Sequence, residues 1–251
     1  IKGKFSISEN KQVYFSKGNL QYRASTNTWR FAENQWDYVG THKINDVNGG
    51  TIDESDNADI SETYSGWIDL FGWATSGYGP KPYSTNTSAT YYRVRSTIAG
   101  TKYDWGLYNV FSNAIGHWRT LTCDEWKYLL NRSSGLLYGI ATVNGVLGLV
   151  LLPDEWDLTS GGFVPRTKDW TTNVYSLQEW EIMQSLGAVF LPAAGHREGT
   201  KVKLSENTGE YWSSQSSDNG TNSLKFTDYF ANTSSNSITC GLSVRLVRDI
   251  D

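Results

Sequence analysis

The sequence is poor in methionine, proline and cysteine, and it lacks long apolar runs. Its 251 residues include one Met, five Pro and two Cys. No stretch approaches the ~18 consecutive apolar residues of a transmembrane helix, so we expect no membrane-spanning segment. The formal net charge is -4 and there is no basic run, which argues against a nucleic acid as a partner.

Aromatic residues are abundant instead. The chain contains 11 Trp and 15 Tyr, which supply a large buried core together with amphipathic contact area. Its polar residues are mostly Asn, Ser and Thr, a composition typical of secreted or surface proteins. The sequence begins at Ile1 without a Met or a signal peptide. We therefore expect an extracellular or cell-surface protein that is exported through a signal absent from this sequence.

The two cysteines, Cys123 and Cys240, leave two alternatives open. A disulfide between them would close a loop of ~100 residues and would stabilise the fold by up to roughly 4–5 kcal/mol in the chain-entropy model. The other alternative is a pair of free buried thiols.

Residues 1–117 predict a β-meander followed by long loops. Val13–Phe15, Leu20–Tyr22 and Trp29–Phe31 are short alternating runs separated by Gly, Asn, Ser and Thr, which is the pattern of a meander. From Val39 to His117 we expect long, self-packed loops. The carboxylates between Asp46 and Asp56 could hold a structural calcium ion, but they lack EF-hand spacing, and a solvated loop is the preferred interpretation.

Residues 118–190 predict two helices and a central hairpin. Thr122–Glu125 and Ser176–Glu179 each have the residue pattern of a capping box, so a helix should begin at each. Asn144-Gly145 lies between β-forming residues and predicts a tight hairpin turn. Val189–Leu191 should form another strand.

Residues 191–251 predict the binding strands. Glu210–Ser214 and Cys240–Arg248 have the composition of core strands, whereas Gln215–Thr239 is rich in Asn, Ser and Thr. A rigid frame around a permissive polar segment is a common way to build a binding surface.

The polar segment also carries a period of two. If Leu224 and Phe226 point into the core, then their neighbours point outward. Aromatic and amide side chains on such a face suit hydrogen-bonded ligand recognition. The predicted ligand-binding residues are Gln215, Ser217, Asp218, Asn222, Ser223, Lys225, Thr227, Tyr229, Asn232 and Asn236.

Several motifs resemble those of one family. Trp118–Trp126 looks like the helix start of the formylglycine-generating-enzyme type of C-type-lectin-like fold, and Gly241–Arg245 looks like its closing strand. Leu191–Gly195 and Tyr211–Ser214 are similar to a branch found in secreted and surface proteins of gut bacteria. The resemblance implies a single α+β C-type-lectin-like domain over residues 1–251, with two helices packed on a twisted antiparallel sheet and long irregular loops.

The resemblance also implies a function. Some members of the family are variable proteins of diversity-generating retroelements, in which selected codons of the C-terminal segment are mutated to vary ligand binding. The oxidases of the family need two nearby cysteines before the closing strand, and Glu210–Thr239 contains none. His42, His117 and His196 show no paired metal-binding spacing.

We therefore predict a non-catalytic surface protein that binds an extracellular protein, peptide or glycan, with no catalytic residues. Two alternatives stay open: an enzyme of the formylglycine-generating type, and a structural subunit of a surface or pilus adhesin assembly.

Overall fold

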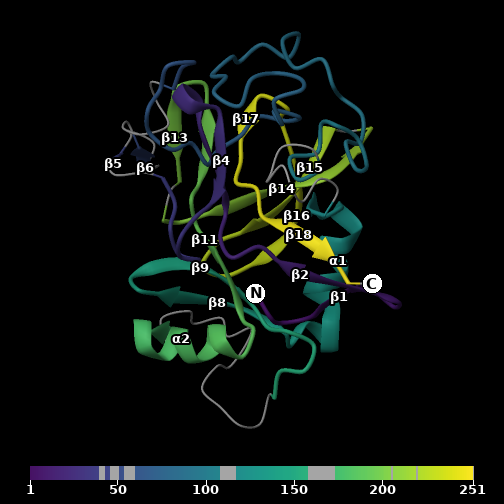
Figure 1. Cartoon of the computed structure of the whole chain (residues 1–251). Helices are drawn as coiled ribbons and strands as arrows, with labels where there is room; N and C mark the ends of the chain where they lie inside the picture. The colour runs from purple at the N-terminus through teal and green to yellow at the C-terminus, as the bar shows by residue number, and fades with distance from the viewer. Residues whose placement is uncertain are drawn as a thin grey trace.

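The protein is mostly β. The computed structural model describes residues 1–39, 43–45, 51–53, 60–107, 117–157, 173–204, 206–218 and 220–250. Strands account for 38% of the structure and helices for 11%. The described strands form five small sheets, with two α-helices beside them (Figure 1).

The first sheet joins the two ends of the chain. It is antiparallel, and its order is β1-β2-β18-β7. Its strands are β1 (Phe5–Ser8), β2 (Lys11–Phe15), β18 (Leu246–Asp249) and β7 (Arg119–Thr120).

The second sheet contains the predicted central hairpin. Its order is β10-β8-β9-β11, and both faces of β9 pack against apolar side chains, which explains its continuous apolar sequence. Asn144 (φ 49°) and Gly145 (φ 79°) both have the positive φ that a type I′ turn requires, as predicted. The strands are β10 (Val174–Tyr175), β8 (Tyr138–Val143), β9 (Val146–Leu151) and β11 (Val189–Pro192).

Three further sheets complete the fold. One has the order β17-β12-β13-β6-β5, with β17 (Cys240–Gly241), β12 (His196–Glu198), β13 (Lys201–Lys203), β6 (Thr51–Asp53) and β5 (Lys43–Asn45). A hairpin pairs β3 (Leu20–Arg23) with β4 (Thr28–Phe31). The C-terminal sheet has the order β14-β15-β16, with β14 (Gly209–Ser217), β15 (Gly220–Phe226) and β16 (Ala231–Asn236).

Both helices begin as predicted. Thr122 caps α1 (Cys123–Asn131) and Ser176 caps α2 (Leu177–Ser185), each in a complete capping box with the Glu three residues later. A 3-10 turn, η2 (Arg132–Gly135), follows α1, and another, η1 (Ala24–Thr26), joins β3 to β4. In the described residues, neither helix has the length and apolar character needed to cross a membrane.

The predicted fold class is wrong. An α+β C-type-lectin-like arrangement would place both helices on one twisted antiparallel sheet. Instead, α1 packs on β1 and on the C-terminal sheet, while α2 lies beside β10 and β8 on the opposite side of the molecule (Figure 1). The capping boxes specify where a helix starts, but not which sheet it covers.

Two predictions for the first 117 residues are corrected as well. The runs near residues 13, 20 and 29 are strands, but β2 pairs with β1 and β18 while β3 pairs with β4, so they do not form one meander. The predicted loop contains β5 and β6. Most of the acidic segment considered for calcium lies outside the described residues.

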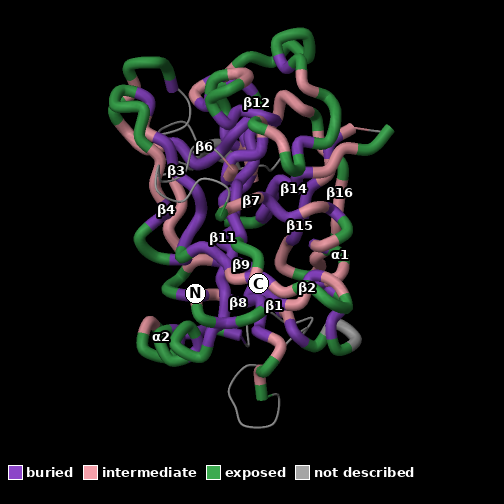
Figure 2. The backbone as a smooth tube through the Cα atoms, turned by 45° about the vertical axis from the view of Figure 1, so that its right-hand side comes forward, coloured by how far each residue is buried: buried purple, intermediate pink, exposed green. Residues whose placement is uncertain are grey.

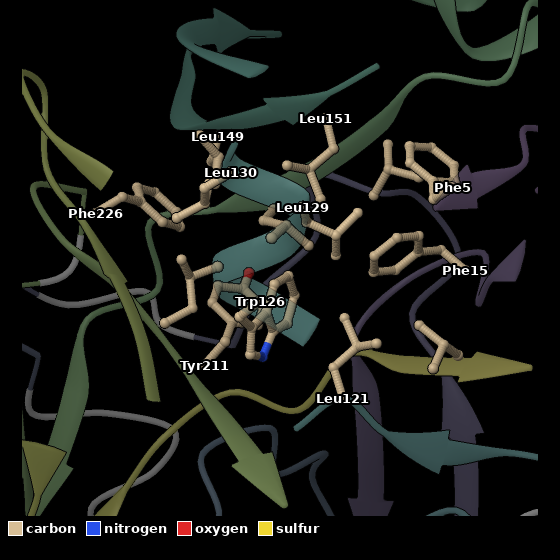
Figure 3. Close-up of a cluster of buried hydrophobic side chains, with 14 of the residues drawn as sticks. Phe5, Phe15, Leu121, Trp126, Leu129, Leu130, Leu149, Leu151, Tyr211 and Phe226 are labelled. Carbon is tan, nitrogen blue, oxygen red and sulfur yellow. The ribbon is translucent and has the colours of Figure 1, made fainter. Parts of the chain in front are cut away.

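The largest apolar core unites three sheets around α1. Trp126, Leu129 and Leu130 of α1 are in the same buried cluster as side chains from the first, second and C-terminal sheets. Figure 3 shows Trp126 between Phe15 and Tyr211, with Phe226 on the side of Leu130. This core supports the inner face of the C-terminal sheet.

Candidate functional site

The C-terminal sheet has two chemically different faces. Tyr211, Leu224 and Phe226 point toward α1 and are completely buried in the core. Directly paired residues of antiparallel strands point to the same side, and sides alternate along each strand. The residues between them therefore form the opposite side, where polar side chains gather.

We call this side the polar face. Glu210 is paired with Lys225 and Lys225 with Asn232, and the neighbouring register pairs Ser223 with Ser234. In Figure 2 the tube of β16 is mostly intermediate or exposed, whereas much of β14 is buried. The polar face consists of Glu210, Ser223, Lys225, Asn232, Ser234 and Asn236. Trp212 and Thr221 lie on the same side of the sheet but are buried, Trp212 in a second apolar core.

Glu210 holds the polar face together. Its side chain is only 2% exposed, yet both carboxylate oxygens have partners. Lys225 Nζ donates to Oε1 at 3.0 Å, and Asn236 Nδ2 donates to Oε2 at 2.9 Å and to Ser223 Oγ at 2.8 Å. A buried carboxylate is tolerated because it is paired and hydrogen-bonded.

The network continues onto β12. His196 Nδ1 lies 3.3 Å from Glu210 Oε1, and His196 Nε2 lies 3.4 Å from Glu198 Oε1. Lys203 Nζ is 2.5 Å from Glu198 Oε2. Burial alone would raise the pKa of Glu210, but its contacts with His196 and Lys225 prevail and lower that pKa to about 2. Glu210 is therefore ionised at neutral pH.

The network fixes polar groups without using up their hydrogen-bonding capacity. The Lys225 ammonium has three protons and donates one to Glu210, and its side chain is 32% exposed. Asn236 uses its amide nitrogen on Glu210 and Ser223, which leaves its amide oxygen as an acceptor. Asn232 is exposed beside Lys225. The face thus presents positioned donors and acceptors to solvent.

A surface depression of about 550 Å³ adjoins one end of the polar face. Thr221 and Asn236, which are paired across β15 and β16, line it, and so do Ser217 and Asp218 at the tip of the β14–β15 hairpin. Arg95, which lies in the chain between β6 and β7, lines the depression too. The polar face and the depression together form a continuous polar surface.

Some predicted binding residues lie off the polar face or are buried within it. Gln215 Oε1 accepts from the backbone N–H groups of Cys123 at 3.0 Å and Asp124 at 3.3 Å, so Gln215 satisfies the N-terminus of α1. Asn222 lies on the same side of β15 as Leu224, away from the polar face. Ser223 is on the polar face but is fully buried beneath Asn236.

Others lie at the far end of the sheet. Thr227 and Phe230 close the turn between β15 and β16 through a 2.9 Å backbone hydrogen bond. Tyr229 at this turn is 71% exposed, with its ring centroid 5.3 Å from that of Phe230. The seven residues of β15 span about 20 Å, so Tyr229 and Asp218 mark opposite ends of the surface.

The structure decides between the alternatives for the cysteines. Cys123 is buried, Cys240 is half-buried, and both are free thiols. Burial and the nearby carboxylates of Glu198 and Glu210 raise the pKa of Cys240, which disfavours the nucleophilic thiolate. In the described part of the chain, no three His, Cys, Asp or Glu residues group as metal ligands would. His42 is outside that part.

Sequence reasoning missed Glu210 and His196 as members of the site. Glu210 alternates with the buried Tyr211, so period two alone could have placed it on the face of Lys225. His196 offered no comparable signal, because β12 belongs to another sheet and meets Glu210 only in the tertiary fold.

Comparison with known proteins identifies no relative of this chain. No family model matches the chain, and no curated protein or solved structure matches it.

Proposed function

We propose that this chain is a non-catalytic binding protein that recognises an extracellular protein, peptide or glycan through the polar face and its adjoining depression. The observation that carries the proposal is the buried Glu210 network. It holds Lys225 and Asn236 in place on a packed sheet while leaving donors and acceptors directed to solvent. Groups that are ordered before binding lose little entropy when a ligand arrives.

The chemistry of the surface favours a ligand rich in hydrogen-bonding groups. Asn232 and Lys225 can recognise hydroxyl, carbonyl or carboxylate groups, and Tyr229 adds an exposed aromatic surface. Tyr gives a large contact area at low entropic cost, whereas Ser and Asn adapt to different partners.

The first test is a binding screen against glycan and peptide arrays with the wild-type chain and two variants. Asn232→Arg places a bulky cation in the middle of the polar face, and Gln178→Arg makes the same charge change on exposed α2. For any array ligand that the wild-type chain binds, we expect Asn232→Arg to weaken binding at least ~10-fold and Gln178→Arg to leave binding unchanged. Equal binding by both variants would place the site elsewhere, and chemical conversion of a bound ligand would favour the enzyme alternative.

We also propose that the surface tolerates sequence variation, as the resemblance to retroelement variable proteins implies. Sequencing the corresponding 3′ coding region in many isolates provides the test. We expect substitutions at exposed Ser217, Asp218, Tyr229 and Asn232, and constancy at buried Ser223. Equal rates at exposed and buried positions would contradict diversification while leaving a dedicated binding site intact.

A further inference from the structure

A second polar site lies on the β3–β4 hairpin, away from the polar face. Figure 2 shows β3 and β4 on the left of the molecule and β15 and β16 on the right. Tyr22 of β3 pairs with Ile68 through two 2.8 Å backbone hydrogen bonds, and both side chains are buried. Because sides alternate along each strand, their neighbours Arg23 and Trp67 face the other way, side by side.

Arg30 joins them from β4. Arg30 pairs with Gln21, which shares a side of β3 with Arg23, so both arginines project from one side of the hairpin. The guanidinium carbon of Arg23 lies 4.2 Å from the centroid of the Trp67 indole, and that of Arg30 lies 3.8 Å from it. The two cationic carbons are therefore at most about 8 Å apart, and like charges at that range repel each other.

Little in the described part of the chain neutralises this pair. Arg23 takes part in none of the ion pairs between described residues, and its buried Nε has no hydrogen-bond acceptor among those residues. Arg30 Nε donates to Gln21 Oε1 at 2.8 Å, which is a neutral partner. Among the described residues, the one carboxylate paired with Arg30 is that of Glu33, at 3.7 Å and on a side chain that is 74% exposed.

The geometry leaves guanidinium N–H donors of both arginines available to bind an anion. Stacking on an indole covers the face of a guanidinium, but the N–H donors of its two terminal nitrogens lie in the plane and can bind an anion at the edge. Two such edges close together match the oxygens of a carboxylate, sulfate or phosphate group, which arginine binds through paired charge-assisted hydrogen bonds. We propose that Arg23, Arg30 and Trp67 form a binding site for the oxyanion group of an acidic ligand.

The test uses the whole chain and the side-chain Nε–H resonances of its arginines, observed by NMR at constant ionic strength. Sodium acetate, sodium sulfate and sodium phosphate are titrated separately against a sodium chloride reference. We expect a saturable shift of the Arg23 and Arg30 resonances with at least one of the three oxyanions. A stronger response to acetate would assign the site to carboxylates, and a stronger response to sulfate or phosphate would assign it to their esters.

Variants distinguish an oxyanion-binding site from an arginine–indole stack that only stabilises the fold. Arg30→Gln should weaken oxyanion binding at least ~10-fold as seen at Arg23, whereas Arg30→Lys, which keeps the charge but not the planar fork, should weaken it less. Arg248→Gln is the matched control, because Arg248 lies 5.5 Å from the Tyr14 ring and no second arginine of the described residues lies over that ring. Circular dichroism confirms that each variant is folded.

Three results would overturn the proposal: no saturable shift with any oxyanion, the same shift in chloride, or the same shift in folded Arg30→Gln. The site is independent of the proposed function, since Asn232→Arg leaves all three of its residues unchanged. Loss of array binding in that variant together with unchanged oxyanion titrations would show two separate sites.

Discussion

Asp104 is a carboxylate placed almost wholly out of contact with water. It is 1% exposed, and its Oδ1 accepts from Thr120 N at 3.0 Å, Thr120 Oγ1 at 2.8 Å and Gly106 N at 3.3 Å. Burial outweighs these hydrogen bonds and raises its pKa to about 6. Between the unfolded pKa of 3.8 and this value, the folded protein holds a proton that the unfolded chain has released.

This difference fixes the sign of a pH effect. Where the folded state binds more protons, the free energy of unfolding falls as pH rises. Asp104 should therefore lower the stability by about 2 kcal/mol between pH 4.5 and pH 7. We expect Asp104→Asn to remove this decrease, because an amide oxygen can keep the three hydrogen bonds of Oδ1 without a charge. Urea unfolding of both proteins at several pH values measures the difference.

Exposed Asp218→Asn serves as the control and should keep the wild-type pH profile. Parallel profiles for wild type and Asp104→Asn would show that Asp104 does not titrate in this range.

At the scale of single elements, the cap of α1 connects helix formation to the candidate site. Thr122 Oγ1 accepts from Glu125 N at 3.2 Å, and Thr122 N donates to Glu125 Oε2 at 2.8 Å. Thr122→Ala should reduce the free energy of unfolding by about 1 kcal/mol, and Thr122→Ser should restore most of it. Chemical denaturation measures the loss.

A second readout tests the connection itself. Because α1 packs on β14, β15 and β16, Thr122→Ala should speed hydrogen exchange at β16 amides. Ser176→Ala removes the equivalent cap of α2, costs a similar amount, and should leave β16 unchanged, since α2 contacts β10 instead. Equal changes at β16 in both variants would mean that exchange there follows global unfolding rather than the support from α1.

The same elements show what the sequence can and cannot reveal. Capping boxes and the Asn144-Gly145 turn act over four residues or fewer, and both were predicted correctly. Sheet partners are chosen by packing across the fold, and the pairing of β2 with β18 has no local signal. The polar composition of residues 215–239 predicts a permissive insert in which Leu224 and Phe226 point inward, and both are buried in the core around α1.

Residues of the candidate site could be predicted only where the period of two along a strand determines which face a side chain lies on. Lys225 was placed on the outer side through Leu224 and Phe226, and the structure puts it on the polar face. The composition of the segment predicts Gln215 as a ligand contact, but its Oε1 accepts hydrogen bonds from backbone N–H groups at the N-terminus of α1. The Glu210–His196 contact joins strands of different sheets, so no sequence pattern could have indicated it.

For the molecule as a whole, the strand period also links the apolar cores to one another. On β14, Tyr211 enters the core around α1, and the next residue, Trp212, enters a second core with Trp73. On β9, Leu149 and Leu151 enter the core around α1, while Val150 between them enters a third core beside α2. Each of these strands is buried on both faces and contributes to two cores. Displacing the strand from one core would therefore disturb the other core as well.

Such sharing predicts cooperative unfolding, although chains of this length often divide into separate units. Trp126→Ala in the core around α1 should cost about 3–5 kcal/mol. Near-UV circular dichroism, sensitive to Tyr211 in the core around α1 and to tryptophans in the other two cores, and far-UV circular dichroism, sensitive to the sheets, should then shift to lower urea concentration together. Leu186→Ala, at a position 63% exposed on the end of α2, should change the midpoint little. If the near-UV signal separated into two transitions while only one moved, the cores would be independent units, and the polar face would be supported by α1 and its own core alone.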